Sequence, residues 1–248
     1  MVPANPLGSI FIELHSVDST NNYAMALVHE GLAQHGTAVF AHEQRKGKGQ
    51  RGKQWVSTRN ENITLSVIIT PFALNISKLF LLSMAVATAV HRFFSRYAGD
   101  ETRIKWPNDL YWRDRKAGGI LIENVLQGSE WKYAIIGIGL NLNQTDFPPM
   151  DRKAVSLKQI TGSTHDPLSL AKELLGDLES ALDQLRSQPD TIADHYRSHL
   201  FRRYQPVRLK QGERVFDASI KDVTDDGQLV VQHALEERFA VGEIEWIL

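Results

Sequence analysis

The residues best suited to chemistry gather in a short glycine-rich and basic segment, Gln44–Trp55. It contains three glycines and five basic side chains. Glycines let the backbone turn its N–H groups toward an anion, and lysine and arginine add charge-assisted hydrogen bonds. The composition therefore suits a site that holds a phosphate or an acyl-phosphate. The alternative interpretation is a flexible, solvated loop.

Two familiar phosphate-binding patterns match this segment in spacing but not in context. Gly47, Gly49 and Gly52 satisfy G-x-G-x-x-G, yet the dinucleotide fingerprint needs glycines that open a helix, and here a strand is expected to follow. The P-loop spacing is also satisfied as far as its lysine. Gln54, however, stands where a P-loop has the Ser or Thr that holds magnesium. Neither pattern therefore predicts a nucleotide-binding helix in this segment.

A second group of polar residues, Lys105–Asp109, follows a predicted strand. Pro107 ends that strand and sets a turn, which fixes the polar residues at the strand end. Farther along, Lys116 precedes two glycines and an apolar strand, a placement that suits the wall of a cavity. The alternatives are an ordinary turn for the first group and a surface lysine in a hairpin turn for Lys116.

The apolar pattern predicts the elements that must position these groups. Strands are predicted over Ile10–Leu14, Thr37–Glu43, Asn62–Thr70, Thr102–Trp106, Gly118–Leu126 and Trp131–Leu142. Helices are predicted to begin at Asp18–Thr20, to span Ser77–Tyr97, and to begin at Asp166 with Pro167 in the first turn. A loop is predicted over Gln44–Gln54, and several short strands over Pro206–Leu248.

These elements predict an α+β fold in two domains. Residues 1–200 are expected to form a mixed sheet packed against helices, and residues 201–248 a small all-β domain.

Bulk properties narrow the class of protein. The formal net charge is −1, which argues against bulk attraction to nucleic acid or an anionic membrane. The absence of cysteine excludes disulfides, thiolate nucleophiles and zinc–cysteine sites, and it suits a reducing compartment. No signal peptide is evident, and the longest apolar stretch is shorter than the ~20 residues of a membrane span. A cytoplasmic protein that binds neither nucleic acid nor membrane is expected.

Together, and in this order, the motifs resemble those of biotin–protein ligases. The matching segments are Val17–Asn21, Gly47–Trp55, Lys105–Leu110, Lys116–Leu121 and Gly137–Asn143. The resemblance covers nearly the whole chain, and it implies a class II synthetase-like biotin/lipoate ligase catalytic domain followed by an SH3-like β-barrel. Some family members carry an N-terminal winged helix-turn-helix and repress transcription. Because the first catalytic strand is reached by Ile10, a ligase without repressor activity is expected.

The resemblance implies two half-reactions, with Mg²⁺ as a cofactor. First, the carboxylate of biotin attacks the α-phosphate of ATP and gives biotinyl-5′-AMP and pyrophosphate. Next, a lysine amine of the biotin carboxyl carrier domain of a carboxylase attacks the mixed anhydride and releases AMP. Such a site must neutralise two anions, align them and keep water away. The resemblance leaves open whether the chain is a homodimer.

The same resemblance assigns residues to the binding of biotin and phosphate. Ser19, Thr20 and Asn21 form one wall of the biotin site, with a helix N-cap as the alternative, and Gln44 binds the ureido head group. The basic segment closes over biotin and phosphate through Gly47, Lys48, Gly49, Gln50, Arg51, Lys53 and Trp55. Lys48 and Gln50 stand where many members have arginine, so the bidentate fork is lost at both positions.

The resemblance also implies a catalytic role for Lys116, which is expected to bind the carboxylate and the α-phosphate and to stabilise charge in both transition states. Arg51 and Lys105 are further catalytic candidates. Gly119 lets the ligand approach the backbone. Asn141 faces the adenine or ribose, or is only a polar residue at a strand end. Lys105 and Asp109 orient Lys116, the acceptor amine or the metal, and the sequence does not choose among these.

Three other functions are weighed against this one. A lipoate– or octanoyl–protein ligase shares the catalytic architecture, but the basic segment and Lys105–Asp109 favour biotin. A nucleic-acid-binding module would use the basic segment, and a non-catalytic sensor would bind biotin or nucleotide only. No protein metal site is predicted, because His195 and His199 lack the glutamate of the H-E-x-x-H motif. The basic segment is expected to become ordered when biotin binds.

Overall fold

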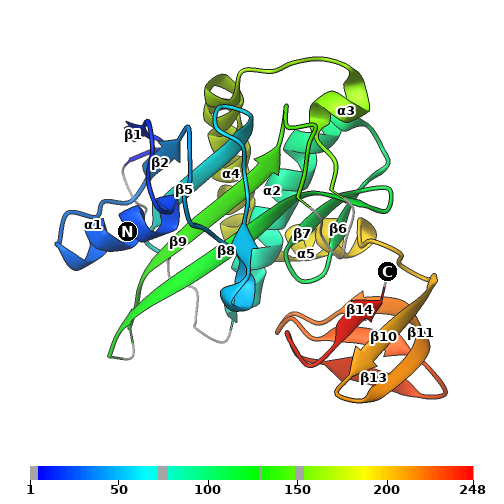
Figure 1. The fold of residues 1–248 in the computed structure, drawn as a ribbon. Helices are drawn as coiled ribbons and strands as arrows, with labels where there is room; N and C mark the ends of the chain where they lie inside the picture. The colour runs from blue at the N-terminus through cyan, green and yellow to red at the C-terminus, as the bar shows by residue number, and fades with distance from the viewer. Residues whose placement is uncertain (1–4, 72–77, 129, 149–153, 248) are drawn as a thin grey trace.

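A seven-stranded mixed sheet forms the larger part of the molecule (Figure 1). The structure is a computed structural model that describes residues 5–71, 78–128, 130–148 and 154–247. The parallel pair β1 and β2 lies at one edge, and the remaining neighbours pair antiparallel. In spatial order the strands are β1 (Ile10–Leu14), β2 (Thr37–Ala41), β5 (Asn62–Ile69), β9 (Glu130–Asn141), β8 (Arg115–Gln127), β7 (Asp109–Trp112) and β6 (Thr102–Lys105).

Helices cover the two faces of this sheet unequally. Alternate strand residues point to opposite faces, so Val39, Ile68 and Ile135 pack with Ala24 of α1 (Thr20–His29), whereas their strand neighbours join the main core. The main core lies on the other face, against α2 (Leu79–Ala98), α3 (Leu157–Thr161), α4 (Pro167–Ser187) and α5 (Pro189–Ser198). None of the described helices is both long and apolar enough to cross a membrane.

The C-terminal part forms a separate five-stranded antiparallel sheet, consistent with an SH3-like domain. Its spatial order is β13 (Glu236–Phe239), β12 (Leu229–Gln232), β11 (Arg214–Val223), β10 (Pro206–Gln211) and β14 (Glu245–Ile247). Leu200 still pairs with Ile104 of the large sheet, and the Tyr204 N–H already donates to the Ile220 carbonyl of β11. This passage between sheets supports a proposed domain boundary at residues 200 and 201.

The predicted strands and helices of the first domain are present with ends shifted by a few residues. The predicted helix start at Ser77 and the predicted strand end at Leu248 lie outside the described residues. The short elements β7, α3 and α5 were not predicted. Strand β7 has four residues directly after the turn, and α5 begins two residues after α4 ends, so neither carries a long enough apolar pattern of its own.

The predicted loop over Gln44–Gln54 is wrong in part, because it contains the short strands β3 (Gly47–Lys48) and β4 (Gln54–Trp55) around the 3-10 turn η1 (Gln50–Gly52). Arg51 and Gly52 adopt positive φ angles of 57° and 74°, which reverse the chain. Gly47 then pairs with Trp55, whose carbonyl leaves no room for a Cβ on Gly47. Residues 47–55 are called the basic hairpin below.

Candidate functional site

One large cavity, of about 1130 Å³, opens on the α1 face of the seven-stranded sheet. The sheet, the basic hairpin and the C-terminal sheet all contribute to its lining. Of the residues predicted from the sequence, all but Gly47 line it: Ser19, Thr20, Asn21, Gln44, Lys48, Gly49, Gln50, Arg51, Lys53, Trp55, Lys105, Lys116, Gly119 and Asn141. Groups up to 122 residues apart in the sequence therefore meet around one space.

An ion pair between Lys116 and Asp109 lies at the base of this cavity. The Lys116 Nζ is 2.6 Å from the Asp109 Oδ1, and the two side chains are only 22% and 15% exposed. The same Nζ lies 5.9 Å from the centre of the Trp55 ring in the basic hairpin. Lys116 of β8 and the cations of the basic hairpin therefore line one cavity.

A β-bulge aims Lys116 into the cavity. Gly119 pairs with Asp109, and Gly118 with Leu110, but the next pair is Lys116 with Tyr111, so Ala117 is an extra residue in β8. Without the bulge, residues three apart on a strand would point to opposite faces. With it, Lys116 and Gly119 both line the cavity.

Gly119 keeps the space beside this ion pair open. A Cβ added there would lie 3.4 Å from the Asp109 Oδ1 and 3.5 Å from the Lys116 Nζ. The backbone of β8 therefore borders the ion pair directly. Lys105, Asp109, Lys116 and Gly119 are together called the sheet floor.

The first turn of α1 is held by Gln44 rather than by its own N-cap residue. The Thr20 N–H and hydroxyl donate to the Gln44 Oε1 at 2.8 and 3.0 Å. Ser19 occupies the N-cap position in an extended conformation, but its side chain makes no capping hydrogen bond. Ser19 instead lines the cavity, so the interpretation of this residue as a helix cap is not supported by its contacts.

A chain of hydrogen bonds, buried at Ser66 and exposed at Lys48, continues from Thr20 across the sheet. The Ser66 Oγ lies 2.7 Å from the Thr20 Oγ1 and 2.6 Å from the Asn21 Oδ1, and its single hydrogen serves one acceptor at a time. The Asn21 amide donates to the Glu123 Oε2 at 2.7 Å, and the Glu123 Oε1 is 3.3 Å from the Lys48 Nζ. Thr20, Asn21 and Gln44 line the cavity, and Ser66 and Glu123 bond to them from outside the lining. The five residues are together called the polar wall.

Two glycines of β9 make room for this arrangement. A Cβ on Gly137 would collide with the side chain of Asn21, and one on Gly139 would collide with the indole of Trp55. Both glycines lie on the α1 face, at alternate positions of one strand. The Trp55 Nε1 is buried and has no hydrogen-bond partner among the described residues.

Asn141 supports the backbone that carries Lys116. Its amide nitrogen lies 3.4 Å from the Lys116 carbonyl and 3.2 Å from the Val155 carbonyl, and the side chain is buried. The Val155 N–H also donates to the Lys116 carbonyl, at 2.9 Å. The geometry indicates a positioning role for Asn141, whose predicted contact with adenine or ribose stays a prediction.

The C-terminal sheet closes the cavity around Lys105 and Arg51. The Lys105 Nζ is buried 4.7 Å from the centre of the Trp246 ring and 5.5 Å from that of Tyr111. The Arg51 guanidinium donates to the Gly242 carbonyl at 3.0 Å, which ties the basic hairpin to the small domain. The small domain is thus part of the site.

Sequence reasoning did not single out several of these residues. Ser66 had a usable signal, since it is a polar residue within the apolar strand Asn62–Ile69. Glu123 and the residues of β14 had none, because their places follow from strand pairing and from how the small domain packs.

Comparisons with known proteins agree with this fold. Residues 13–141 match the Biotin/lipoate A/B protein ligase family. The biotin--[acetyl-CoA-carboxylase] ligase of Mycobacterium tuberculosis is 31% identical over 216 residues, 85% of this chain and 79% of that protein. The bifunctional ligase/repressor BirA of Escherichia coli is 30% identical over 178 residues, 71% of this chain and 54% of that protein.

The chain spans only about half of the length of the BirA proteins that it matches, 52–58%. In fold, it is similar to the biotin protein ligase of Aquifex aeolicus in complex with biotin and ATP, with a TM-score of 0.79 over 96% of this chain and 98% of that one, at 24% identity. The chain belongs to the biotin/lipoate A/B protein ligase family.

Proposed function

We propose that this chain is an ATP-dependent biotin–protein ligase that forms biotinyl-5′-AMP and transfers biotin to a lysine of a biotin carboxyl carrier domain. The observation that carries the proposal is the Lys116–Asp109 pair in a cavity shared with the basic hairpin and the polar wall. Relatives from Mycobacterium tuberculosis and Paracoccus denitrificans bear the name biotin--[acetyl-CoA-carboxylase] ligase, which supports this choice.

The size of the cavity suits two substrates. Ligand pockets commonly measure roughly 300–1,000 Å³, and this cavity measures about 1130 Å³. Biotin would lie along the polar wall beside Ser19, Thr20 and Asn21. Because the Gln44 Oε1 accepts from Thr20, the amide nitrogen of Gln44 is left to donate, and we assign it as the donor to the ureido carbonyl of biotin.

In the first half-reaction, Lys116 would lie between the two anions that must meet. An oxygen of the biotin carboxylate attacks the α-phosphorus, the new O–P bond forms, and the bond to pyrophosphate breaks. The Lys116 ammonium offsets the repulsion and the charge that grows on the α-phosphate oxygens, and Asp109 holds it in place. Lys105 would add positive charge from the same floor.

The basic hairpin would retain the mixed anhydride. Lys48, Gly49, Gln50 and Lys53 line the cavity opposite the floor and would close over the phosphate, with the contact between Arg51 and Gly242 anchoring the closed position. Exclusion of water protects the anhydride from hydrolysis. In the second half-reaction, the acceptor amine attacks the acyl carbon, and AMP leaves with the bonding electron pair.

Magnesium would accompany ATP. This cation prefers hard oxygen ligands and is commonly held by one or two carboxylates together with substrate phosphates. The cavity lining includes the carboxylates of Asp109 and Glu245, so the donor set fits. When bound, the ion would neutralise part of the charge on the phosphates.

The direct test of the reaction class is ATP–pyrophosphate exchange with biotin, lipoate or octanoate as the acid. Exchange that depends on biotin supports the proposal, whereas exchange only with lipoate or octanoate would assign the chain to the other branch of its family. Binding of biotin and ATP without any exchange would indicate a sensor. Transfer of labelled biotin to a carrier domain, compared with a carrier whose acceptor lysine is replaced by arginine, tests the second step.

Assembly and location are further inferences from the proposed reaction. A carrier domain and ATP meet in the cytoplasm, so we infer that location. A homodimer stays a prediction, and light scattering of the purified chain tests it. Which carboxylase supplies the acceptor would follow from the transfer assay.

A further inference from the structure

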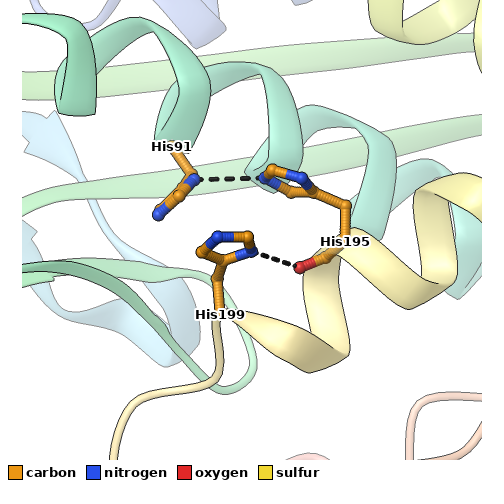
Figure 2. A group of neighbouring side chains, drawn as sticks. All are labelled: His91, His195 and His199. Atoms are coloured by element: carbon orange, nitrogen blue, oxygen red, sulfur yellow. Dashed lines mark hydrogen bonds between the residues drawn. The ribbon is translucent and has the colours of Figure 1, made fainter. Parts of the chain in front are cut away.

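Three histidines that are absent from the cavity lining meet on the opposite side of the sheet (Figure 2). His91 lies on α2, His195 on α5, and His199 is the residue that ends α5. One ring nitrogen of each lies within 4.8 Å of the other two. His195 and His199 are four residues apart, so they share one helical face, and packing of α5 on α2 adds His91.

The hydrogen bonds of two rings fix which nitrogen carries a lone pair. The His91 Nε2 is 3.2 Å from the Thr102 carbonyl, and the His199 Nδ1 is 2.8 Å from the His195 carbonyl. A carbonyl only accepts, so each of these nitrogens donates. The lone pairs of the neutral rings therefore lie on the His91 Nδ1 and on the His199 Nε2, the nitrogen that faces the His91 ring (Figure 2).

The His91 lone pair points at His195. The His91 Nδ1 is 3.2 Å from the His195 Nε2, so the His195 Nε2–H donates a hydrogen bond to it. A bound ion would replace that hydrogen, with the proton of His195 on its Nδ1 instead. Bonds of 2.0–2.1 Å to a tetrahedral ion would separate two ligand nitrogens by about 3.3 Å. Histidines that bind metals also usually donate their second ring N–H to a carbonyl or carboxylate, as His91 and His199 do.

For His91 and His195, burial favours the neutral form of the ring, which a metal requires. Burial lowers the pKa of His91 to about 4 and that of His195 to about 3, with a smaller contribution from His199 in each case. Both rings are thus neutral near pH 7, and neutral imidazole is the ligand form. Since the cluster has no carboxylate, its chemistry favours zinc, copper, nickel or cobalt over magnesium or calcium.

We propose that His91, His195 and His199 form a binding site for an imidazole-preferring divalent transition ion such as Zn²⁺, with water as the fourth ligand, that fixes α5 against α2. His195 and His199 are partly exposed, which gives the ion and the water a path to the site. The ion would be structural, because the three residues are absent from the cavity lining and contact no predicted substrate group.

The site lies where the chain passes to the small domain. The Ile104 N–H donates to the His199 carbonyl at 2.9 Å, and the Phe201 N–H donates back to the Ile104 carbonyl at 2.8 Å. Lys105 of the sheet floor follows Ile104 directly. A bound ion would therefore stabilise the junction that holds the C-terminal sheet over the cavity.

The test uses untagged full-length chain, stripped with a chelator and titrated with ZnCl₂ by calorimetry. The expected result is one saturable Zn²⁺ per chain, a higher melting temperature with Zn²⁺, and a tetrahedral visible spectrum with Co²⁺. His195→Ala should weaken Zn²⁺ binding at least tenfold and abolish the Co²⁺ signature. His29→Ala, an exposed histidine of α1, is the matched control and should change neither.

Should His195→Ala fold poorly, His199→Gln serves the same purpose on the partly exposed side of the cluster. No saturable binding would overturn the proposal, and the histidines would then be a hydrogen-bonded stack only. Equal Zn²⁺ affinity of the His195 and His29 variants would also overturn it, because the ion would then bind elsewhere. The outcome does not depend on the proposed ligase reaction.

Discussion

The cavity receives positive charge from two regions, the sheet floor and the basic hairpin, and the two are held very differently. On the floor, Lys105 is 2% exposed between aromatic rings, and Lys116 is paired with a carboxylate at 2.6 Å. In the hairpin, the Lys48 side chain is 42% exposed and makes a looser pair with Glu123 at 3.3 Å. The two strands of the basic hairpin, β3 and β4, are only two residues long each.

The two regions therefore suit two different requirements of the proposed reaction, stabilisation of the transition state and retention of the intermediate. Charge that stabilises a transition state must already be in place, so it belongs on a rigid sheet with its partners fixed. A short two-stranded ribbon is marginally stable by itself and opens at low cost in free energy. The floor is thus suited to the chemistry, and the hairpin to admitting substrates and retaining the intermediate.

The largest expected effect follows from removing the floor's ammonium group. Lys116→Ala should lower the rate of biotin-dependent pyrophosphate exchange by about 10²–10³-fold, as loss of one aimed donor commonly does. Lys132→Ala, which alters an exposed lysine bonded to Gln127, is the matched control and should leave the rate unchanged. A fall of less than about threefold for Lys116→Ala would break the assignment of chemistry to the floor.

The next effect concerns the carboxylate that holds Lys116. Asp109→Asn keeps the shape of the side chain but replaces the charge-assisted bond to Lys116 with a neutral one. Loss of such a bond costs about 1.5–3 kcal/mol, so the exchange rate should fall roughly 10–150-fold. Asp109→Glu should recover part of the rate. If neither variant changes kcat while both unfold more easily, Asp109 supports the sheet and does not position the lysine.

Ser66 tests whether the polar wall is built into the fold. Ser66→Ala removes a donor and leaves the buried Asn21 Oδ1 without its hydrogen, which should lower the free energy of unfolding by about 1–3 kcal/mol. Urea unfolding measures this, with Ser187→Ala, an exposed serine of α4, as the control. The KM for biotin should also rise. Unchanged stability and unchanged KM together would show that the wall does not depend on Ser66.

The smallest effect is expected in the hairpin. Lys48→Ala breaks an exposed ion pair, so stability should change by less than about 1 kcal/mol. The exchange rate should fall only severalfold, and more biotinyl-5′-AMP should be lost to solvent. A loss of exchange as large as that of Lys116→Ala would erase the contrast between the two regions.

Local signals made much of this molecule predictable from its sequence. Asp166 and Pro167 begin α4 as expected, with the Asp166 side chain accepting from the Ser169 N–H. The alternation over Asn62–Ile69 and the turn at Pro107 also follow from nearest-neighbour chemistry. Most of the predicted site residues line one cavity because they lie at strand ends and in turns of one sheet.

The remainder depends on pairings that no local pattern contains. The bulge at Ala117 appears only once β8 has β7 as a partner, yet it decides where Lys116 points. His91 joins the histidine pair of α5 from 104 positions away. The paired strands of the basic hairpin were missed because its glycines and cations are also typical of an unstructured loop.

The contrast between floor and hairpin is tested most directly by a single-turnover, rapid-quench measurement of biotinyl-5′-AMP. Its rate of formation and its rate of loss would be followed in the wild type, Lys116→Ala and Lys48→Ala. The account predicts slow formation in Lys116→Ala, and near-normal formation with faster loss in Lys48→Ala. Slow formation in Lys48→Ala together with normal formation in Lys116→Ala would contradict it.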